Sequence, residues 1–552
     1  MSERAIIYAV IFAVYLGFLI WGVIKSLGQV ESFSDFTTGG HRMGLVLGVG
    51  TSVATWVSVA SIMGVPGYLY RTGAAAIIGW VAGWFLCTAL FPILTWKIRM
   101  PKLPMRTFPE FMRLRYEPQV ERSPLQIFVA LLMFVGYFIF THLQVVGFGI
   151  VFHTITGIPY EYAIFGFLLI LALTCSGGFW SVAASDTINA GLILIGLTVG
   201  AGAVLHATGG IGNIMDAIAA TTAPVNVGGP ELEPGIMLTA TGSFGAGALF
   251  SIFISNALGS FVAPHWITRF MAPKNAKAAT LQMMWTLIFL VPIFACLIIF
   301  GLGSKALMPS LPIDKTTDYI MPLIMDQYAP PVVAAMTLVA LLAAAVSTAN
   351  SMLLNCSTSL YYDVYKALSG NKTMDQKAAT RNLRIWVMAL GCLAVLSAIK
   401  PPMLLAMGFT YVYAAFGSIF LWAVLLGVYW KKMNREAAYA AIGVGFVVFL
   451  YGKITGHTNP MLLSTSLSLI ALLIAVKFGA PAPLAAYEAF FEPDVSPETM
   501  RTILRIRHED DSDAAVMAAL GNTASAGASA TAGQSGAIET GPEMAPEATA
   551  KA

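Results

Sequence analysis

The amino-acid sequence predicts an all-α polytopic membrane protein, and three features support this fold class. Of the 552 residues, 57% are hydrophobic and only 11% are charged, whereas about a quarter of the residues of a soluble domain are charged. The mean hydropathy is +0.76. Apolar runs recur at roughly the 20 residues that a helix needs to cross a bilayer, without the alternation of barrel strands.

The apolar runs predict about 13 transmembrane helices. They cover residues 5–25, 45–70, 75–98, 124–155, 158–177, 183–206, 242–262, 279–303, 330–362, 383–399, 402–429, 436–453 and 460–478. The first run is longer than the apolar region of a signal peptide, and no small-residue cleavage site follows it, so we interpret it as a retained span. An odd number of spans places the two termini on opposite sides of the membrane.

Lys and Arg residues indicate the orientation, because positive residues are retained in cytoplasmic loops. Of the 31 Lys and Arg residues, 20 fall in one set of predicted loops, six in the opposite set and five at or beyond the end of the last span. The N-terminus is therefore predicted to lie outside the cell and the C-terminus in the cytoplasm. The net charge of +3 follows from this asymmetry and does not indicate a nucleic-acid partner.

Two predicted spans contain helix breakers at corresponding places. These are Gly48, Gly50, Gly64, Pro66 and Gly67 in the span from residue 45, and Gly245, Gly247, Gly259 and Pro264 in the span from residue 242. Each broken span begins a set of five, and a second unit with an odd number of spans inserts upside down, as in inverted-repeat transporters. Gly and Pro are also common in membrane helices generally, so the spacing alone leaves both interpretations open.

The breakers and the changes in composition divide the chain into six segments. We expect an extra N-terminal helix with a cytoplasmic loop (1–44), a first repeat (45–206), an extracellular loop (207–241), a second repeat (242–429), two further helices (430–478) and a cytoplasmic tail (479–552). The tail ends in a run of Ala, Gly, Ser and Thr, which predicts that it is largely disordered. The five cysteines lack metal-ligand spacing, and no cofactor is predicted.

The span at 330–362 carries an unusual number of polar residues for a membrane helix. Hydroxyls and amides are costly in lipid, so they need either helix partners or a polar ligand. Ala344, Ser347 and Thr348 lie within about one turn of one another. Na⁺ prefers oxygen ligands, and a broken helix frees carbonyls that a regular helix would use. The alternative is that the hydroxyls bond back to carbonyls one turn earlier.

Several phrases of the sequence resemble the sodium/solute symporter family. They are SDFTTGGHR (34–42), ATWVS (54–58), MGVPG (63–67), TGIPY (156–160), SGGFW (176–180), PHWITRFMA (264–272) and GVYWKKMN (427–434). The phrase at 63–67 is most similar to the proline-transporting branch. The resemblance implies a bacterial inner-membrane protein with a 5+5 inverted-repeat core of the leucine-transporter type, preceded by one helix and followed by two.

The resemblance also implies where sodium binds. In this family the main site uses carbonyls at the break of core helix 1 and a carbonyl and two hydroxyls of core helix 8. These positions correspond to Ala54, Val57, Ala344, Ser347 and Thr348. Sodium enters this scheme as the coupling ion and not as a cofactor.

Asp186 is the one carboxylate predicted inside a core span rather than near its end, and a buried charge there is a candidate for function. Some family members have a second sodium site, which would correspond here to Asp186, Ser347, Asn350 and Ser351. A structural hydrogen bond and a proton site are the two alternatives for Asp186.

Eight polar residues are predicted to face the central cavity and contact the solute. They are Ser58, Ser61, His142, Gln144, Ser255, Asn256, Tyr411 and Tyr413. Each is also a common type of helix-packing contact. The carboxylate and lysine used by sugar-transporting relatives are missing from 75–98 and 279–303, and Trp56 stands where the proline branch has an Asp.

These features predict a sodium-coupled symporter that imports a small anionic or zwitterionic organic solute by alternating access. A monocarboxylate of the acetate, pyruvate or lactate type fits best, since half-helix N-termini favour an anion. The alternative solute is a small, proline-like amino acid. A proton-coupled symporter and a transporter-derived sensor are further alternatives. No nucleophile and base pair or metal cluster suggests an enzyme.

Overall fold

The structure is a computed structural model that describes residues 3–30, 32–99, 105–175, 177–369, 376–400, 404–492, 495–507 and 509–521. Within these residues the chain forms helices and no β-strand. The helices of the first half are α1 (Glu3–Ser26), α2 (Phe33–Thr38), α3 (Leu45–Trp56), α4 (Val65–Thr72), α5 (Gly83–Arg99), α6 (Phe108–Tyr116), α7 (Pro124–Thr156), α8 (Tyr160–Ala163), α9 (Gly166–Thr174), α10 (Gly178–Thr208) and α11 (Ile211–Ala220).

The second half continues in the same way. Its helices are α12 (Ala246–Ile254), α13 (Pro264–Met271), α14 (Ala276–Leu307), α15 (Ile320–Tyr328), α16 (Pro331–Thr358), α17 (Ala367–Ser369), α18 (Gln376–Ser397), α19 (Leu405–Tyr429), α20 (Arg435–Ile454), α21 (Pro460–Phe478), α22 (Leu484–Phe491) and α23 (Pro497–Ile506). Four π-helical stretches, Ala60–Gly64, Ile77–Ala82, Ser255–Gly259 and Ser359–Lys366, adjoin these helices.

The helices account for the membrane spans that the sequence predicts. Among the described residues, 11 helices are long and apolar enough to cross a membrane, or 12 when the bent pair at 45–72 counts as one span. The remaining predicted span, 158–177, corresponds to the shorter apolar segment Tyr160–Thr174. The predicted all-α polytopic fold is therefore confirmed, with a count that depends on how this short segment is treated.

Two spans are interrupted where the sequence places its breakers. The first bends by 46° between α3 and the helical stretch from Ala60. The second leaves helical geometry at Ala263 (φ −63°, ψ 129°), directly before Pro264. Proline lacks the backbone N–H that a continuous helix needs and disfavours helical geometry in the preceding residue, so Pro264 begins a new helix.

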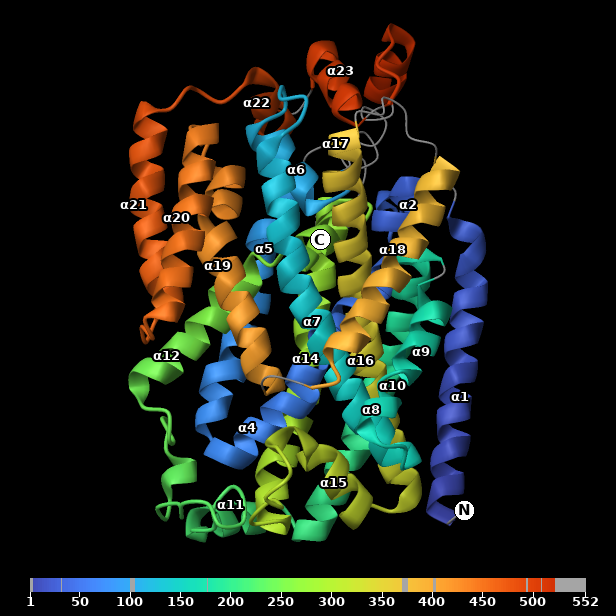
Figure 1. The fold of residues 1–552 in the computed structure, drawn as a ribbon, viewed down its shortest axis with the longest axis vertical. Helices are drawn as coiled ribbons and strands as arrows, with labels where there is room; N and C mark the ends of the chain where they lie inside the picture. Colours follow the sequence, from blue (N-terminus) through green and yellow to red (C-terminus); the bar gives the residue numbers. More distant parts are fainter. Residues whose placement is uncertain are drawn as a thin grey trace, which may run out of the picture.

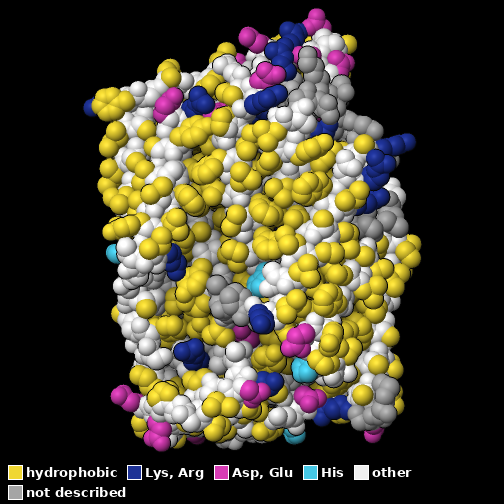
Figure 2. All heavy atoms as spheres, in the orientation of Figure 1, with side chains coloured by type: hydrophobic (Ala, Val, Ile, Leu, Met, Phe, Trp, Pro, Cys, Tyr) yellow, Lys and Arg dark blue, Asp and Glu magenta, His cyan; other side chains and the backbone are white. Residues whose placement is uncertain are grey.

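The two broken spans run through the bundle in opposite directions. We name the end that carries α22 and α23 the tail end, and the end that carries α11 and the start of α1 the far end (Figure 1). The second half of the first broken span, α4, lies toward the far end, as does the first half of the second, α12. Apolar side chains cover the flank of the bundle between these ends, and charged side chains gather toward both of them (Figure 2).

Helix α16 lies at the centre of the bundle. In an apolar 18-residue window of the span Pro331–Ser369, which contains α16, 83% of the residues are buried, compared with 28% for α1 and for α21. It packs against α1, α3, α7 and α10. The polar residues of α16 therefore face neighbouring helices and not lipid.

The predicted tail contains ordered elements. Helix α22 packs on α6 and on α23, and α23 carries the buried residues Met500, Ile503 and Leu504. The disorder predicted for the end of the chain concerns residues 522–552, which lie outside the described residues.

Candidate functional site

The break after α3 releases two backbone carbonyls. In a continuous helix the amides of Ser58 and Val59 would donate to the carbonyls of Ala54 and Thr55. Here Val57 leaves helical geometry (φ −85°, ψ 76°), the Ser58 amide donates to the Trp56 carbonyl at 3.0 Å, and the Val59 amide donates to Oε1 of Gln144 at 3.3 Å. The carbonyls of Ala54 and Thr55 are therefore available to other partners.

Two hydroxyls of α16 bond to these released carbonyls. Ser347 Oγ lies 3.0 Å from the Ala54 carbonyl oxygen and 3.1 Å from that of Ala344. Thr348 Oγ1 donates to the Thr55 carbonyl at 3.4 Å. Bonding back along α16 accounts for the contact with Ala344, but not for the two contacts that cross to α3.

Four of the five residues predicted for the first sodium site thus lie on the two facing segments, and Val57 occupies the break itself. Both hydroxyl-bearing side chains are buried, Ser347 at 0% and Thr348 at 1% exposure. The junction brings carbonyl and hydroxyl oxygens together in a dry environment, which is the kind of donor set that a desolvated alkali cation requires.

Asp186 on α10 has a charged neighbour that the sequence reasoning missed. Its Oδ2 accepts from Thr51 Oγ1 at 2.7 Å and from Ser351 Oγ at 3.4 Å. The guanidinium of Arg269 on α13 lies 3.8 Å from the same oxygen. Arg269 also donates to Ser351 Oγ at 2.7 Å, and it contacts Thr55 Oγ1.

These contacts form a polar junction of α3, α10, α13 and α16, made by Thr51, Thr55, Asp186, Arg269 and Ser351. The other residues predicted for a second sodium site have different partners. Ser347 bonds to α3, and Oδ1 of Asn350 accepts from the Cys175 thiol, at a sulfur distance of 3.5 Å. The need of a buried carboxylate for a counter-charge was the signal that could have pointed to Arg269.

The residues predicted to contact the solute lie in several different places. Ser61 and Gln144 bond to the break, Ser61 through the carbonyls of Trp56 and Ser58 at 3.2 and 2.8 Å. Ser58 and Ser255 are buried. Asn256 Nδ2 donates to the Ile252 carbonyl at 3.0 Å and to the Gly79 carbonyl at 3.3 Å, which joins the second broken span to the residues before α5.

Tyr411 and Tyr413 have different surroundings. Tyr411 is 38% exposed and its ring lies under Lys453 Nζ at 3.5 Å. Tyr413 is buried, and residues two apart on a helix point to nearly opposite sides. His142 Nδ1 lies 2.9 Å from Ser397 Oγ and so joins α7 to α18.

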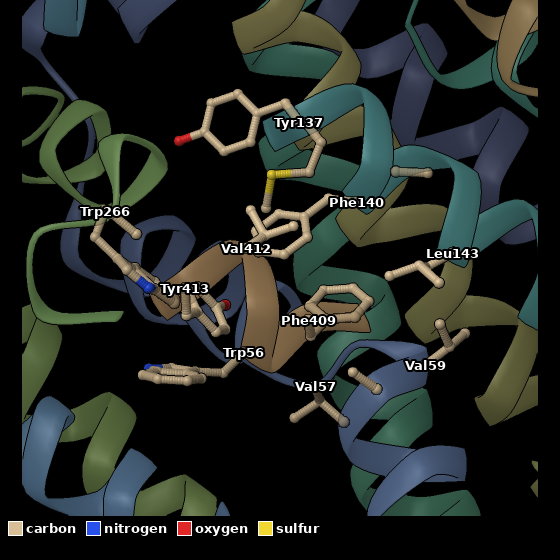
Figure 3. Packing of buried hydrophobic residues seen from close by; sticks show 14 of the residues in the cluster. Trp56, Val57, Val59, Tyr137, Phe140, Leu143, Trp266, Phe409, Val412 and Tyr413 are labelled. Atoms are coloured by element: carbon tan, nitrogen blue, oxygen red, sulfur yellow. The ribbon is translucent and has the colours of Figure 1, made fainter. Parts of the chain in front are cut away.

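An aromatic cluster surrounds the break (Figure 3). The ring centroids of Trp56 and Trp266 are 4.9 Å apart, and those of Phe140 and Tyr413 are 5.1 Å apart. The cluster contains buried polar atoms that lack a protein partner among the described residues, namely the indole nitrogens of Trp56, Trp84 and Trp266 and Nε2 of His265. The amide nitrogen of Gln144, at the break, is a further such donor. Buried donors without partners are costly and therefore suit a site for a polar ligand.

The same chain resembles solved symporters in three dimensions. It matches a Na⁺-coupled sialic acid symporter in a substrate-bound outward-open state with a TM-score of 0.71, at 20% identity, over 87% of this chain and 99% of that one. It matches Mhp1, a nucleobase-cation-symport-1 family transporter in a closed conformation, with a TM-score of 0.51 at 14% identity, over 82% and 97% of the two chains. The chain therefore shares the inverted-repeat fold of these transporters, as the sequence predicts.

Sequence comparison identifies the family. The sodium/pantothenate symporter of Escherichia coli (strain K12) is 27% identical over 82% of this chain and 92% of its own length. The sodium/proline symporter of the same strain is 25% identical over 80% and 85%. The family description "Sodium:solute symporter family" matches residues 36–445, which include both broken spans and the residues of α16. This chain is a multi-pass membrane protein that belongs to the sodium:solute symporter family.

Proposed function

We propose that this symporter couples the entry of one sodium ion to that of a small solute that carries a carboxylate. A monocarboxylate of the acetate, pyruvate or lactate type is the solute that we favour. The contact of Ser347 with the released carbonyl of Ala54 carries the sodium part of the proposal. The proposed ligands are the carbonyls of Ala54, Val57 and Ala344 and the hydroxyls of Ser347 and Thr348.

The solute class is supported by the donors near the break. The unpaired N–H groups of Trp56, Trp266 and Gln144 are suited to the oxygens of an anion. The relatives are named for pantothenate and for proline, and both compounds contain a carboxylate. A small amino acid is therefore the second candidate, and the proline symporters among the relatives favour it.

The position of Arg269 supports a ratio of one sodium per solute. The Arg269 guanidinium already balances the negative charge of the Asp186 carboxylate. A cation held by the same carboxylate oxygens would be repelled by that guanidinium. Asp186 thus has a structural role in this proposal, and the second sodium set of Asp186, Ser347, Asn350 and Ser351 becomes the alternative that the stoichiometry tests.

The orientation is proposed from the loops. The basic loops predicted to be cytoplasmic include the residues around α6 and between α13 and α14, so we propose that the tail end faces the cytoplasm and the start of α1 the outside. Protease treatment of right-side-out vesicles should remove a tag placed before residue 3 and leave a tag at the C-terminus.

Uptake by the purified protein in liposomes tests the function. Acetate, pyruvate, lactate, pantothenate, proline and a hexose are offered with an inward gradient of Na⁺, of H⁺ or of neither. We expect accumulation of at least one carboxylate only with the sodium gradient. Uptake driven by the proton gradient alone, or uptake of the hexose alone, would contradict the proposal.

A further inference from the structure

An apolar groove runs along the membrane-facing side of α3. It has a volume of about 370 Å³, which lies within the range of small-molecule sites. Helices α3, α10 and α14 form its walls, and we call it the α3–α10–α14 groove. Its lining residues include Val46, Gly50, Val53, Gly191, Trp285 and Phe289.

The groove faces the bilayer. Val46 is 77% exposed, Trp285 45% and Phe289 39%, and all three belong to spans or span halves that cross the membrane. The lining residues of α3 belong to the half that starts at the tail end, so the groove extends from there toward mid-depth. Lipid acyl chains are the medium at this depth, which identifies the class of molecule that meets the groove.

Exposed positive charge lies at the tail-end mouth of the groove. Lys277 is exposed in the first turn of α14, eight residues before Trp285, and this corresponds to ~12 Å along a helix axis. Lys274 is exposed just before the same helix. Basic residues at the edge of the hydrocarbon attract anionic lipid head groups.

We propose that the α3–α10–α14 groove is a specific site for one anionic phospholipid, with an acyl chain in the groove and its head group near Lys274 and Lys277. Because the groove wall contains Val53, the neighbour of Ala54, the lipid packs against the helix whose carbonyls are proposed to hold sodium. This last link rests on the proposed function, whereas lipid binding itself does not.

Gly191 offers a direct way to fill the groove. A Cβ at Gly191 has no atom within 4 Å, so Gly191→Leu projects into the groove without a clash at its first carbon. Gly202 lies 11 residues later on the same helix and is equally open, but does not line the groove. Gly202→Leu is therefore the matched control.

Quenching of Trp285 by lipids with brominated acyl chains measures occupancy. The protein is reconstituted in phosphatidylcholine bilayers that contain brominated phosphatidylglycerol or brominated phosphatidylcholine, without sodium or solute. The difference between the wild type and Trp285→Phe isolates the signal of Trp285. We expect brominated phosphatidylglycerol to quench Trp285 at a concentration at least about fivefold below that needed for brominated phosphatidylcholine. The attraction of one or two lysines for an anionic head group provides a preference of this size.

Gly191→Leu should abolish this preference while Gly202→Leu keeps it, and the double variant Lys274→Gln, Lys277→Gln should reduce it. Equal quenching by the two lipids in the wild type would overturn the proposal, because it would indicate ordinary contact with bulk lipid. If the wild type forms a dimer and Gly191→Leu dissociates it, the proposal would also be overturned, because a second copy of the chain would then occupy the groove. If Gly191→Leu does not fold, the lysine variant still decides the outcome.

Discussion

At the scale of single residues, the contact between Ser347 and the break is the one on which the proposed sodium site depends. Replacing Ser347 by Ala removes a hydroxyl that bonds to the Ala54 carbonyl. Hydrogen bonds to charged groups contribute about 1.5–3 kcal/mol, so we expect Ser347→Ala to raise the sodium concentration for half-maximal uptake about tenfold or more. Thr348→Ala should act in the same direction.

The matched control for these variants is Ser357→Ala. Ser357 is also buried on α16 but lies ten residues from Ser347, away from the break. Uptake assayed over a range of sodium concentrations should give the wild-type value for this control. If Ser347→Ala and Thr348→Ala both kept the wild-type sodium dependence, the assigned site would be wrong.

The pair of Asp186 and Arg269 gives a second prediction at this scale. Removing one partner of a buried ion pair leaves an uncompensated charge and costs about 3–5 kcal/mol. Asp186→Asn should therefore lower the melting temperature of the purified protein, and the double variant with Arg269→Gln should be less destabilised than the two single effects predict together. An unchanged melting temperature together with fewer charges moved per solute would instead support a second sodium ion at Asp186.

At the scale of secondary-structure elements, α23 is held on α6 by an ion pair between Arg507, the residue after α23, and Glu110 of α6. Arg507 Nε lies 2.7 Å from Glu110 Oε1, and both side chains are nearly buried. Arg501 pairs with Asp513, but both of these side chains are largely exposed. Arg507→Gln should therefore release α23, whereas Arg501→Gln on the same helix should have little effect. Hydrogen exchange of residues 497–507 measures the difference, and equal protection in both variants would contradict it.

The contact between Arg507 and Glu110 should depend on pH. Burial by itself raises the pKa of Glu110, but the charges of Arg507 and Arg106 outweigh this effect and hold the pKa below its usual 4.5. Because the pKa of Glu110 is lowered, the ion pair stabilises the docking of α23 fully above pH 4.5. This stabilisation is lost as the pH falls through the lowered pKa of Glu110. The protection factors of residues 497–507, which are corrected for the intrinsic pH dependence of exchange, should fall below about pH 4.5 in the wild type and be insensitive to this range in Glu110→Gln.

Much of this organisation could be predicted from the sequence, and the rest has identifiable reasons for being missed. Hydropathy and breakers located the spans and the two breaks, and the excess of polar residues singled out α16, because these signals are local. The pairing of Asp186 with Arg269, 83 residues apart, and of Glu110 with Arg507, 397 residues apart, depends on how helices pack. The different surroundings of Tyr411 and Tyr413 follow from the helical angle that separates them, which a list of polar residues does not contain.

At the scale of the whole molecule, the coupling ratio determines which force drives uptake. One sodium with a monoanion moves no net charge, whereas one sodium with a zwitterion moves one. A single charge gains about 2.3 kcal/mol from 100 mV, which corresponds to nearly fiftyfold accumulation.

Uptake of a monocarboxylate should therefore be unaffected by an imposed membrane potential, and uptake of an amino acid should rise steeply with it. Proteoliposomes with a potassium gradient and valinomycin, with equal sodium on both sides, provide the measurement. Potential-driven accumulation of a monocarboxylate would show that more than one sodium accompanies it.

The hydrogen bond from the Val59 amide to Gln144 determines which carbonyl of α3 faces Thr348 at the break. Since that amide is the natural partner of the Thr55 carbonyl in a continuous helix, α7 supplies an acceptor that competes with α3 for its own backbone. The Thr55 carbonyl that accepts from Thr348 is thus not free by virtue of α3 alone. It stays free while α7 remains packed against the break, so a movement of α7 would shift Thr348, a proposed sodium ligand, although α7 itself contributes none of the proposed ligands.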